Sequence, residues 1–273
     1  MEQFSIQRLS PQLVRIGGLM HEFMYLVEGG ERVALIDTGG GFGSLRQVVR
    51  SLTGKPLVVL LTHGHVDHAM GAGEFEDVWM DPRDIPVFCQ HARQAFRIEA
   101  LHGARPRLEQ DPPMIPCADP RRFHPLRDGA GFDLGGVHLD VFECPGHTPG
   151  SMVVLLRELR TLAVGDACSS FTFLGGPESL SVAAYRENLL RLRSRLEGRF
   201  DTVLDAHGTG RLPADIIDEV IGVCDDVLAG RTDDVPCAFA GHKGVLAKAR
   251  RPHSLLRQDG GCGNVFYCKN RIV

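Results

Sequence analysis

Short apolar runs alternate with amphipathic stretches along most of this chain. Residues 22–30, 31–40 and 56–61 are apolar, rich in β-forming residues and close to glycine or proline, which predicts strands. Between them, 44–52 ("SLRQVVRSL") carries apolar residues at helical spacing and predicts a helix. The run 56–61 ("PLVVLL") is apolar almost throughout, as expected for a strand that is covered on both faces.

The same alternation continues in the second half of the chain. Further strands are predicted within 136–151, 151–159, 160–170 and 200–210, and helices at 181–198 and 213–230. Strands that alternate with helices are typical of a layered α/β domain. A chain of 273 residues fits one large domain or two small ones, and we expect a single domain over 1–273.

One segment, 84–130, departs from this pattern. Its first part, 84–103, predicts a helix, and the remainder is dense in proline and arginine. A long irregular stretch inside a compact domain is often a functional loop or lid. A surface excursion without a role is the alternative, so we interpret 84–130 as a possible lid insertion.

Composition narrows the class of protein. The chain has 273 residues, 43% of them hydrophobic, and a net charge of −4, which argues against nucleic acid as the main partner. No apolar run is long enough to span a membrane, and the start does not resemble a secretory signal. We therefore expect a cytoplasmic protein with a small-molecule substrate, and no prediction is made of its oligomeric state.

Histidine and aspartate are concentrated just after the strand predicted at 56–61. The stretch "LTHGHVDHAMG" (61–71) contains His63, His65, Asp67 and His68. These residue types bind zinc and other divalent metals. Four of them within six positions, at the end of a buried strand, predict a metal site there.

Three further strand ends have the same character. His147 lies in "CPGHTPGS", Asp166 in "AVGDACSS" and His207 in "VLDAHGTG". Each is at or just past the end of an apolar run and has glycine nearby, which allows a sharp turn and close backbone approach. We therefore expect these loops to converge on one edge of a sheet.

The chemistry of this set predicts two metal ions. Five imidazoles and two carboxylates suit zinc first, with iron or manganese as alternatives. They are too many for one tetrahedral zinc ion but sufficient for two ions that share an aspartate and keep positions open for water. A hydroxide held between two cations is a nucleophile at neutral pH.

These motifs resemble the metallo-β-lactamase superfamily, and the resemblance runs from "VALIDTGG" to "DAHGTG". It implies an αββα sandwich of the α/β class with metals at the sheet edge. By resemblance, His63, His65 and His147 would hold the first metal, and Asp67, His68 and His207 the second. Asp166 would bridge them. Asp37, in "LIDTG", matches an aspartate near the metals that supports ligands rather than binding metal itself.

The ligand set also indicates a branch of the superfamily. The presence of Asp166 and His68 resembles the glyoxalase II and lactonase branches, whereas true β-lactamases lack the bridging aspartate. The resemblance implies a dinuclear hydrolase that attacks a thioester or lactone carbonyl with a metal-bridging hydroxide, with Asp67 helping to protonate the leaving group.

Three other functions remain open. A mononuclear iron persulfide dioxygenase would leave Asp67, His68 and His207 without a role. A dimetal phosphodiesterase would use the same ions, because phosphate esters suit a two-metal clamp. A non-catalytic sensor of small metabolites would bind metal and ligand without turnover.

The residues that would bind substrate are less well indicated. Phe171, Phe173 and Tyr185 are candidates for the substrate pocket, although Phe171 and Phe173 could equally belong to an ordinary core. The basic segment 242–257 could receive a carboxylate or phosphate, or be a solvated face. His91 and His102, on the predicted lid helix, are interpreted as surface or core residues rather than ligands.

Overall fold

The protein is described by a computed structural model that covers residues 3–273. The chain divides into two compact units, unit 1 (Met1–Val141) and unit 2 (Phe142–Val273). No helix within residues 3–273 is long and apolar enough to cross a membrane. The predictions of a single domain over 1–273, of a lid and of a cytoplasmic location are not tested by these observations and stay predictions.

Unit 1 contains most of the strands. Its strands are β1 (Ser5–Ser10), β2 (Leu13–Gly17), β3 (Phe23–Glu28), β4 (Val33–Ile36), β5 (Leu57–Leu60), β6 (Val78–Met80), β7 (His124–Pro125), β8 (Gly131–Asp133) and β9 (His138–Glu143), in which the unit boundary falls. Its helices are α1 (Leu45–Leu52), α2 (Val66–Ala69), α3 (Ile85–His91) and α4 (Gln94–Ala104), and short 3-10 turns lie at Met70–Glu74, Pro82–Asp84 and Pro120–Arg122.

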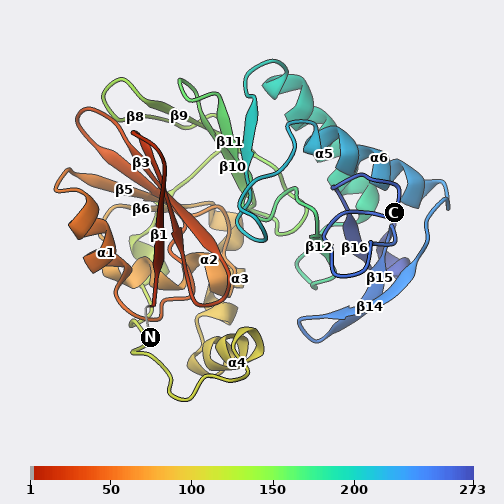
Figure 1. Ribbon diagram of the computed structural model, residues 1–273, viewed down its shortest axis with the longest axis horizontal. Coiled ribbons are helices and arrows are strands. Elements are labelled where there is room, and N and C mark those ends of the chain that lie inside the picture. Colours follow the sequence, from red (N-terminus) through yellow and green to blue (C-terminus); the bar gives the residue numbers. More distant parts are fainter. Residues whose placement is uncertain (1–2) are drawn as a thin grey trace. The chain divides into compact units, whose positions relative to one another are not determined.

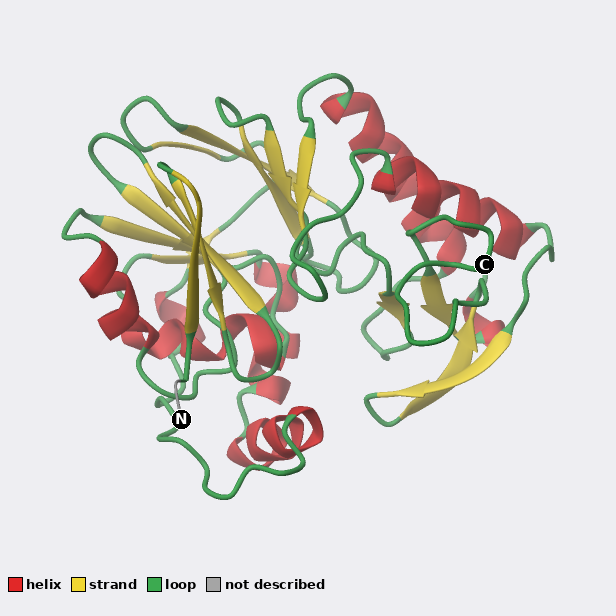
Figure 2. Cartoon of the chain, in the orientation of Figure 1, coloured by secondary structure: helices red, strands yellow, loops and turns green. Residues whose placement is uncertain are grey.

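Seven strands of unit 1 form one large sheet with helices on one face. The seven strands β1 to β7 pair in sequence order, antiparallel from β1 to β4 and parallel from β4 to β7. Strands β8 and β9 form an antiparallel hairpin. Leu45 of α1, Phe88 of α3 and Leu101 of α4 pack with strand residues such as Leu35 and Val59 in one buried cluster. The four helices accordingly gather at one face of the sheet (Figures 1 and 2).

The strands and the first helix predicted in this unit are found close to the expected bounds. Helix α1 begins after Ser44, whose hydroxyl accepts a hydrogen bond from the Gln47 amide and caps the helix. The single helix predicted at 84–103 is instead two helices, because Arg93 is extended (φ −62°, ψ 131°) and interrupts the helical backbone. After this break, α4 places Arg97 in the interior of unit 1.

Unit 2 contains two long helices and two groups of strands. The helices are α5 (Val182–Leu196) and α6 (Ile216–Leu228), and a 3-10 turn lies at Lys269–Arg271. The strands are β10 (Met152–Leu156), β11 (Thr161–Ala163), β12 (Thr172–Leu174), β13 (Thr202–Leu204), β14 (Val235–Phe239), β15 (His242–Leu246) and β16 (Val265–Tyr267). Strand β11 pairs antiparallel with β10 and parallel with β13, and a separate four-stranded sheet has the order β12-β16-β15-β14.

Helices α5 and α6 lie side by side and form the centre of the core of unit 2 (Figure 1). Leu189 of α5 and Val220 of α6 belong to one buried cluster with Leu162 of β11 and Val265 of β16. Helix α5 begins at the predicted position, where the Ser181 hydroxyl accepts from the Ala184 amide. Both helices predicted for this part of the chain are therefore confirmed.

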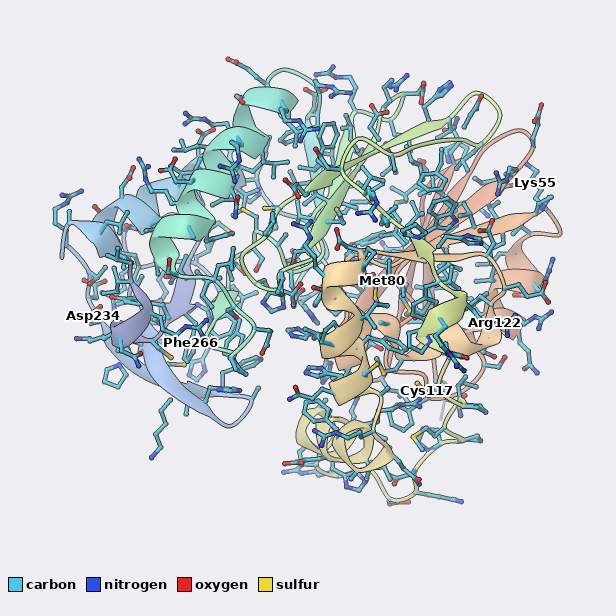
Figure 3. All side chains as sticks on the ribbon, turned by 180° about the vertical axis from the view of Figure 1, so that it is seen from behind. Lys55, Met80, Cys117, Arg122, Asp234 and Phe266 are labelled. Atoms are coloured by element: carbon cyan, nitrogen blue, oxygen red, sulfur yellow. The ribbon has the colours of Figure 1, made fainter. Side chains whose placement is uncertain are left out.

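A polar cluster joins the segment before β14 to β16 and the turn that follows it. The Tyr267 and Thr232 hydroxyls each donate to Asp234 Oδ1 over 2.6 Å, and Lys269 Nζ lies 2.8 Å from Asp234 Oδ2. Asp234 and Phe266, the neighbour of Tyr267 on β16, are both labelled in Figure 3. Burial alone would raise the pKa of Asp234, but the hydrogen bonds from Lys269, Thr232 and Tyr267 lower it to about 2.

We expect Asp234→Asn to lower the free energy of unfolding by about 1 kcal/mol at pH 7, because the charged carboxylate is the better acceptor. The folded pKa of Asp234 lies below its ordinary value of 3.8, so its stabilisation is present above that value and is lost as pH falls toward about 2. Urea unfolding at several pH values should show the difference from wild type shrinking between about pH 4 and pH 2. A constant difference over this range, or an equal effect of Glu197→Gln at an exposed site, would rule out this origin.

Candidate metal centre

The first group of predicted ligands, His63, His65, Asp67 and His68, lies in unit 1 at the ends of two parallel strands. Strands β4 and β5 pair in parallel with Ile36 opposite Leu60, so the residues that follow both strands meet at one edge of the sheet. Asp37 follows β4, and its amide donates to the Leu60 carbonyl over 3.0 Å. We call the four residues the first donor group, and its three histidines are buried.

Asp37 orients two histidines of the first donor group. Its Oδ2 lies 2.8 Å from His68 Nδ1 and accepts a 2.8 Å hydrogen bond from the Thr62 hydroxyl. The Thr62 oxygen in turn lies 3.1 Å from His63 Nδ1. Because the Thr62 hydroxyl donates to Asp37, it accepts from His63, and both histidines carry the proton on Nδ1. This is the arrangement that fixes metal-binding histidines through their second ring nitrogen.

Further contacts tie the residues of the first donor group to one another and to the loop after β4. The amide and hydroxyl of Thr38 both donate to the His68 carbonyl, over 2.7 and 3.0 Å, which ties the loop after β4 to α2. The His63 ring lies 4.7 Å from that of His65 and 4.0 Å from that of His68, centroid to centroid. His68 Nε2 faces Asp67 Oδ1 at 3.8 Å. The four side chains therefore lie close together, with the His63 ring in contact with both other histidines.

His91, for which the sequence predicts an ordinary surface or core position, contacts this group directly. Its ring stacks on that of His65, with centroids 4.6 Å apart and an interplanar angle of 8°. Its Nδ1 accepts a 3.0 Å hydrogen bond from the Val66 amide, so this nitrogen is unprotonated. Phe96 packs against the same ring at 4.2 Å. His91 is thus a positioning residue for His65, and the spacing of the sequence offered no signal for the contact.

We expect His91→Ala to lower zinc affinity about 10-fold, because residues that orient ligands commonly contribute that much. His91→Asn should restore part of the affinity, since its amide oxygen can accept from Val66. Competition with a chromophoric chelator measures the affinity independently of any enzymatic activity. The control is His102→Ala, on the neighbouring helix, where the side chain is exposed and pairs with Asp111. Equal affinities in the His91 and His102 variants would contradict the positioning role.

The second group of predicted ligands, His147, Asp166 and His207, lies in unit 2, and we call it the second donor group. Strands β11 and β13 pair in parallel with Ala163 opposite Leu204, so the loops after them are neighbours. These loops carry Asp166 and His207. Burial raises the pKa of Asp205, just before His207, to about 7. The loop after β13 is therefore built around a buried carboxyl group.

His147 lies in the loop that precedes β10. The Ser179 hydroxyl donates to the His147 carbonyl over 2.9 Å, and the Leu180 amide donates to the Gly146 carbonyl over 2.8 Å. His147 Nδ1 lies 2.8 Å from the Phe173 carbonyl, which can only accept, so Nδ1 carries the proton. Nε2 is then the nitrogen available for metal binding, as in His63 and His68.

The two oxygens of Asp166 face two different histidines. Oδ2 lies 3.6 Å from His147 Nε2, and Oδ1 lies 3.3 Å from His207 Nε2. Two ligands bound at about 2.0–2.2 Å and a tetrahedral angle lie roughly 3.3 Å apart, so these separations suit a zinc ion between each pair. His147 Nε2 is unprotonated, so its approach to the Asp166 carboxylate is electrostatically favourable only with a cation between them. The donor set of unit 2 thus fits metal ions.

Tyr185, predicted to line the substrate pocket, supports the second donor group from inside unit 2. Its side chain is 0% exposed and belongs to the main core cluster, and its hydroxyl donates to the Ala167 carbonyl over 2.6 Å. A Cβ at Gly146 would meet the Tyr185 ring at 2.0 Å, so glycine is required there. Tyr185 is placed in the core rather than at an open surface, and the predicted pocket role remains a prediction for Phe171 and Phe173.

The basic segment 242–257 is partly neutralised by neighbouring acids. Lys248 pairs with Asp226 at 2.7 Å, and Arg257 pairs with Asp259 at 2.7 Å. Arg250 donates to the Ser170 carbonyl over 2.7 Å. The segment is therefore not one continuous cationic patch.

Comparison with known proteins places this arrangement in a family. The family model described as the metallo-beta-lactamase superfamily matches residues 17–195, about two thirds of the chain. The chain belongs to the metallo-β-lactamase superfamily. The matched residues include all of the first donor group as well as His147 and Asp166, whereas His207 lies beyond them.

Curated relatives of this superfamily member include enzymes with named substrates. It is 24% identical over 189 residues to a probable metallo-hydrolase of Bacillus subtilis, covering 67% of this chain and 83% of that protein. It is 27% identical over 203 residues to an acyl-coenzyme A thioesterase of Gallus gallus, covering 67% and 71%. An uncharacterized Mycobacterium tuberculosis protein is 32% identical over 126 residues, covering 45% of this chain and 54% of that protein. The chain thus spans about half the length of these mycobacterial relatives.

Solved structures confirm the predicted fold of this superfamily member. A metallo-beta-lactamase from Pontibacter korlensis has a TM-score of 0.57 at 17% identity, over 81% of this chain and 98% of that one. A superfamily protein from Sulfolobus tokodaii has a TM-score of 0.56 at 20% identity, over 81% and 85%. The chain therefore has the metallo-β-lactamase fold of the α/β class.

Proposed function

We propose that this protein is a hydrolase that uses two divalent metal ions, preferably zinc, to hydrolyse a thioester or a lactone. The observation that carries the proposal is the position of Asp166, whose two carboxylate oxygens face His147 and His207 at 3.6 and 3.3 Å. An aspartate that serves two histidines in this way suits a ligand shared by two ions. A mononuclear centre would need only one of these contacts.

The two donor groups supply complementary ligands for such a centre. We propose that His63, His65 and His147 hold one ion, that Asp67, His68 and His207 hold the other, and that Asp166 binds both. Support comes from the superfamily match, which covers six of these seven positions. Iron or manganese could occupy the same imidazole and carboxylate ligands.

The metals and the protein would contribute different parts of the chemistry. Two bound ions would supply a hydroxide nucleophile at neutral pH and polarise the carbonyl oxygen of the substrate. Asp37 keeps Nδ1 of His68 protonated directly and that of His63 through Thr62, so that both rings would bind through Nε2. Asp67, whose side chain is 25% exposed, is proposed to carry a proton to the leaving group.

The proposed substrate class is based on the chemistry of the reaction and on the names of the relatives. In thioester hydrolysis, water adds to the carbonyl carbon and the C–S bond breaks, which yields a carboxylate, a thiol and one proton. The relatives named acyl-coenzyme A thioesterase and hydroxyacylglutathione hydrolase are named for this reaction, the latter at 28% identity over 136 residues. We therefore place thioesters before lactones.

Proton release in weakly buffered solution tests this proposal. Zinc-loaded protein is offered matched panels of thioesters and lactones, and the assay is repeated after chelation. We expect chelator-sensitive turnover of at least one panel, with thioesters the faster. No release from either panel by protein with a full metal content would contradict the proposal. Persulfide oxidation and phosphodiester cleavage would then be assayed on the same preparation.

A further inference from the structure

An exposed aromatic ring lies at the end of the β14–β15 hairpin of unit 2. Phe239 is the last residue of β14 and is 49% exposed. It is the only aromatic residue among the exposed large hydrophobic side chains of residues 3–273. Half-exposed aromatic rings are costly to leave in water and are frequent at binding surfaces.

Phe239, Phe171, Phe173 and Phe266 form a series of contacting aromatic rings, the aromatic stack, which leads to the second donor group. Phe239 is its outermost ring. Its ring lies 4.9 Å from that of Phe171 and 5.5 Å from that of Phe173, centroid to centroid. Phe173 lies 6.2 Å from the His147 ring, and its carbonyl fixes His147 Nδ1. Phe266, 0% exposed, stacks on Phe173 at 5.0 Å and joins the stack to the core. The exposed end of the stack is therefore connected to a proposed metal ligand by direct contacts.

Arg250 fixes the middle of this stack. Its guanidinium carbon lies 5.0 Å from the centre of the Phe171 ring, and its Nη2 donates to the Ser170 carbonyl, four residues after Asp166. A guanidinium on the face of a ring is attracted by the ring's negative face. Phe171 thus contacts both Arg250 and Phe239.

A second apolar side chain lies at the other end of the donor group. A Cβ on Gly208, the residue after His207, would meet Leu255 Cδ1 at 2.9 Å, so Leu255 covers this turn. Leu255 is 40% exposed. Apolar side chains with exposed surface thus lie near both ends of the second donor group, at His147 and at His207.

From these contacts we infer that Phe239, with Phe171 and Phe173, forms the binding surface for the acyl group of the substrate, and that Phe239 determines acyl specificity. This inference rests on the proposed function, which puts the reacting carbonyl at the donor groups. A medium-length aliphatic or an aryl acyl group would lie across the rings and exclude water from them. We expect an acetyl group, four carbons shorter than hexanoyl, to gain less from contact with Phe239, so that this ring selects for longer acyl groups.

The test compares two acyl lengths on one thiol carrier. The kcat/KM values for hexanoyl- and acetyl-coenzyme A are measured for wild type, Phe239→Ala and Phe239→Leu. We expect Phe239→Ala to lower the hexanoyl-to-acetyl ratio about 10-fold, the usual effect of removing one apolar contact from a pocket. Phe239→Leu should retain most of the ratio. The control is Val235→Ala, 37% exposed on the same strand, which should leave the ratio unchanged.

Binding measured without turnover separates this inference from the proposed function. Calorimetry gives Kd values for S-hexyl- and S-methyl-coenzyme A thioethers, which cannot be hydrolysed. We expect wild type to prefer the hexyl compound and Phe239→Ala to lose about 10-fold of that preference. This result would support the surface even if no thioester were hydrolysed. An equal loss of affinity for both thioethers in Phe239→Ala would overturn it, as would an unchanged preference for the hexyl compound in that variant.

Discussion

Asp166→Ala is expected to lower kcat/KM for the best substrate by at least about 10³-fold, because it removes the ligand shared by the two proposed ions. Asp166 is only partly buried in a loop, with 21% of its side chain exposed. Its removal should therefore leave the core of unit 2 folded. The loss belongs to the chemical step and to metal content, so kcat should fall together with the number of bound ions.

A matched variant makes this result interpretable. Asp201→Ala removes another aspartate of unit 2, one that pairs with Arg160 at the surface with 67% of its side chain exposed. It should leave both activity and metal content close to wild type. Steady-state kinetics and mass spectrometry of metal-loaded samples give both quantities. Full activity in Asp166→Ala protein that holds no metal would exclude the two-metal account.

Of the substitutions proposed for this protein, Arg97→Met is expected to cause the largest loss of stability, about 3 kcal/mol in the free energy of unfolding. Arg97 is 2% exposed, and burial lowers the pKa of its guanidinium. It donates to the carbonyls of Ile115, Gly40 and Gly41 over 2.7, 3.3 and 2.7 Å. Methionine fills a similar volume but has no donor, so these carbonyls would lose their partner.

The same variant should also weaken zinc binding at the first donor group. Gly40 and Gly41 belong to the loop that begins with Asp37, which orients two histidines of the first donor group. Loosening this loop should weaken zinc binding as well as stability. Urea unfolding and the chelator competition measure the two effects. Arg93→Met, at an exposed position just before the same helix, is the control, and an equal unfolding midpoint in both variants would contradict the proposed role of Arg97.

The strand ends that carry the donor groups could be predicted from sequence because each combines a local apolar run with polar residues directly after it. The run before His63 became β5, and the runs before Asp166 and His207 became β11 and β13. Their parallel pairing with a neighbouring strand follows from the alternation of strands and helices. Local pattern was sufficient because each signal lies within about ten residues.

Contacts between distant segments could not be predicted in this way. His91 was interpreted as ordinary, because nothing near it in the sequence shows that its ring stacks on His65. The burial of Arg97 depends on carbonyls more than fifteen residues away in the sequence, and no local pattern indicates it. Phe239 lies on β14, a strand that was not predicted and that pairs only with β15. In each case tertiary packing decides the role.

The number of zinc ions bound per chain is the most direct test of a two-metal centre. Native mass spectrometry of zinc-saturated protein counts them without any substrate. We expect two ions in the wild type and one in His207→Ala, which removes a proposed ligand of the second ion only. A single ion in the saturated wild type, with the same count in His207→Ala, would contradict a two-metal centre.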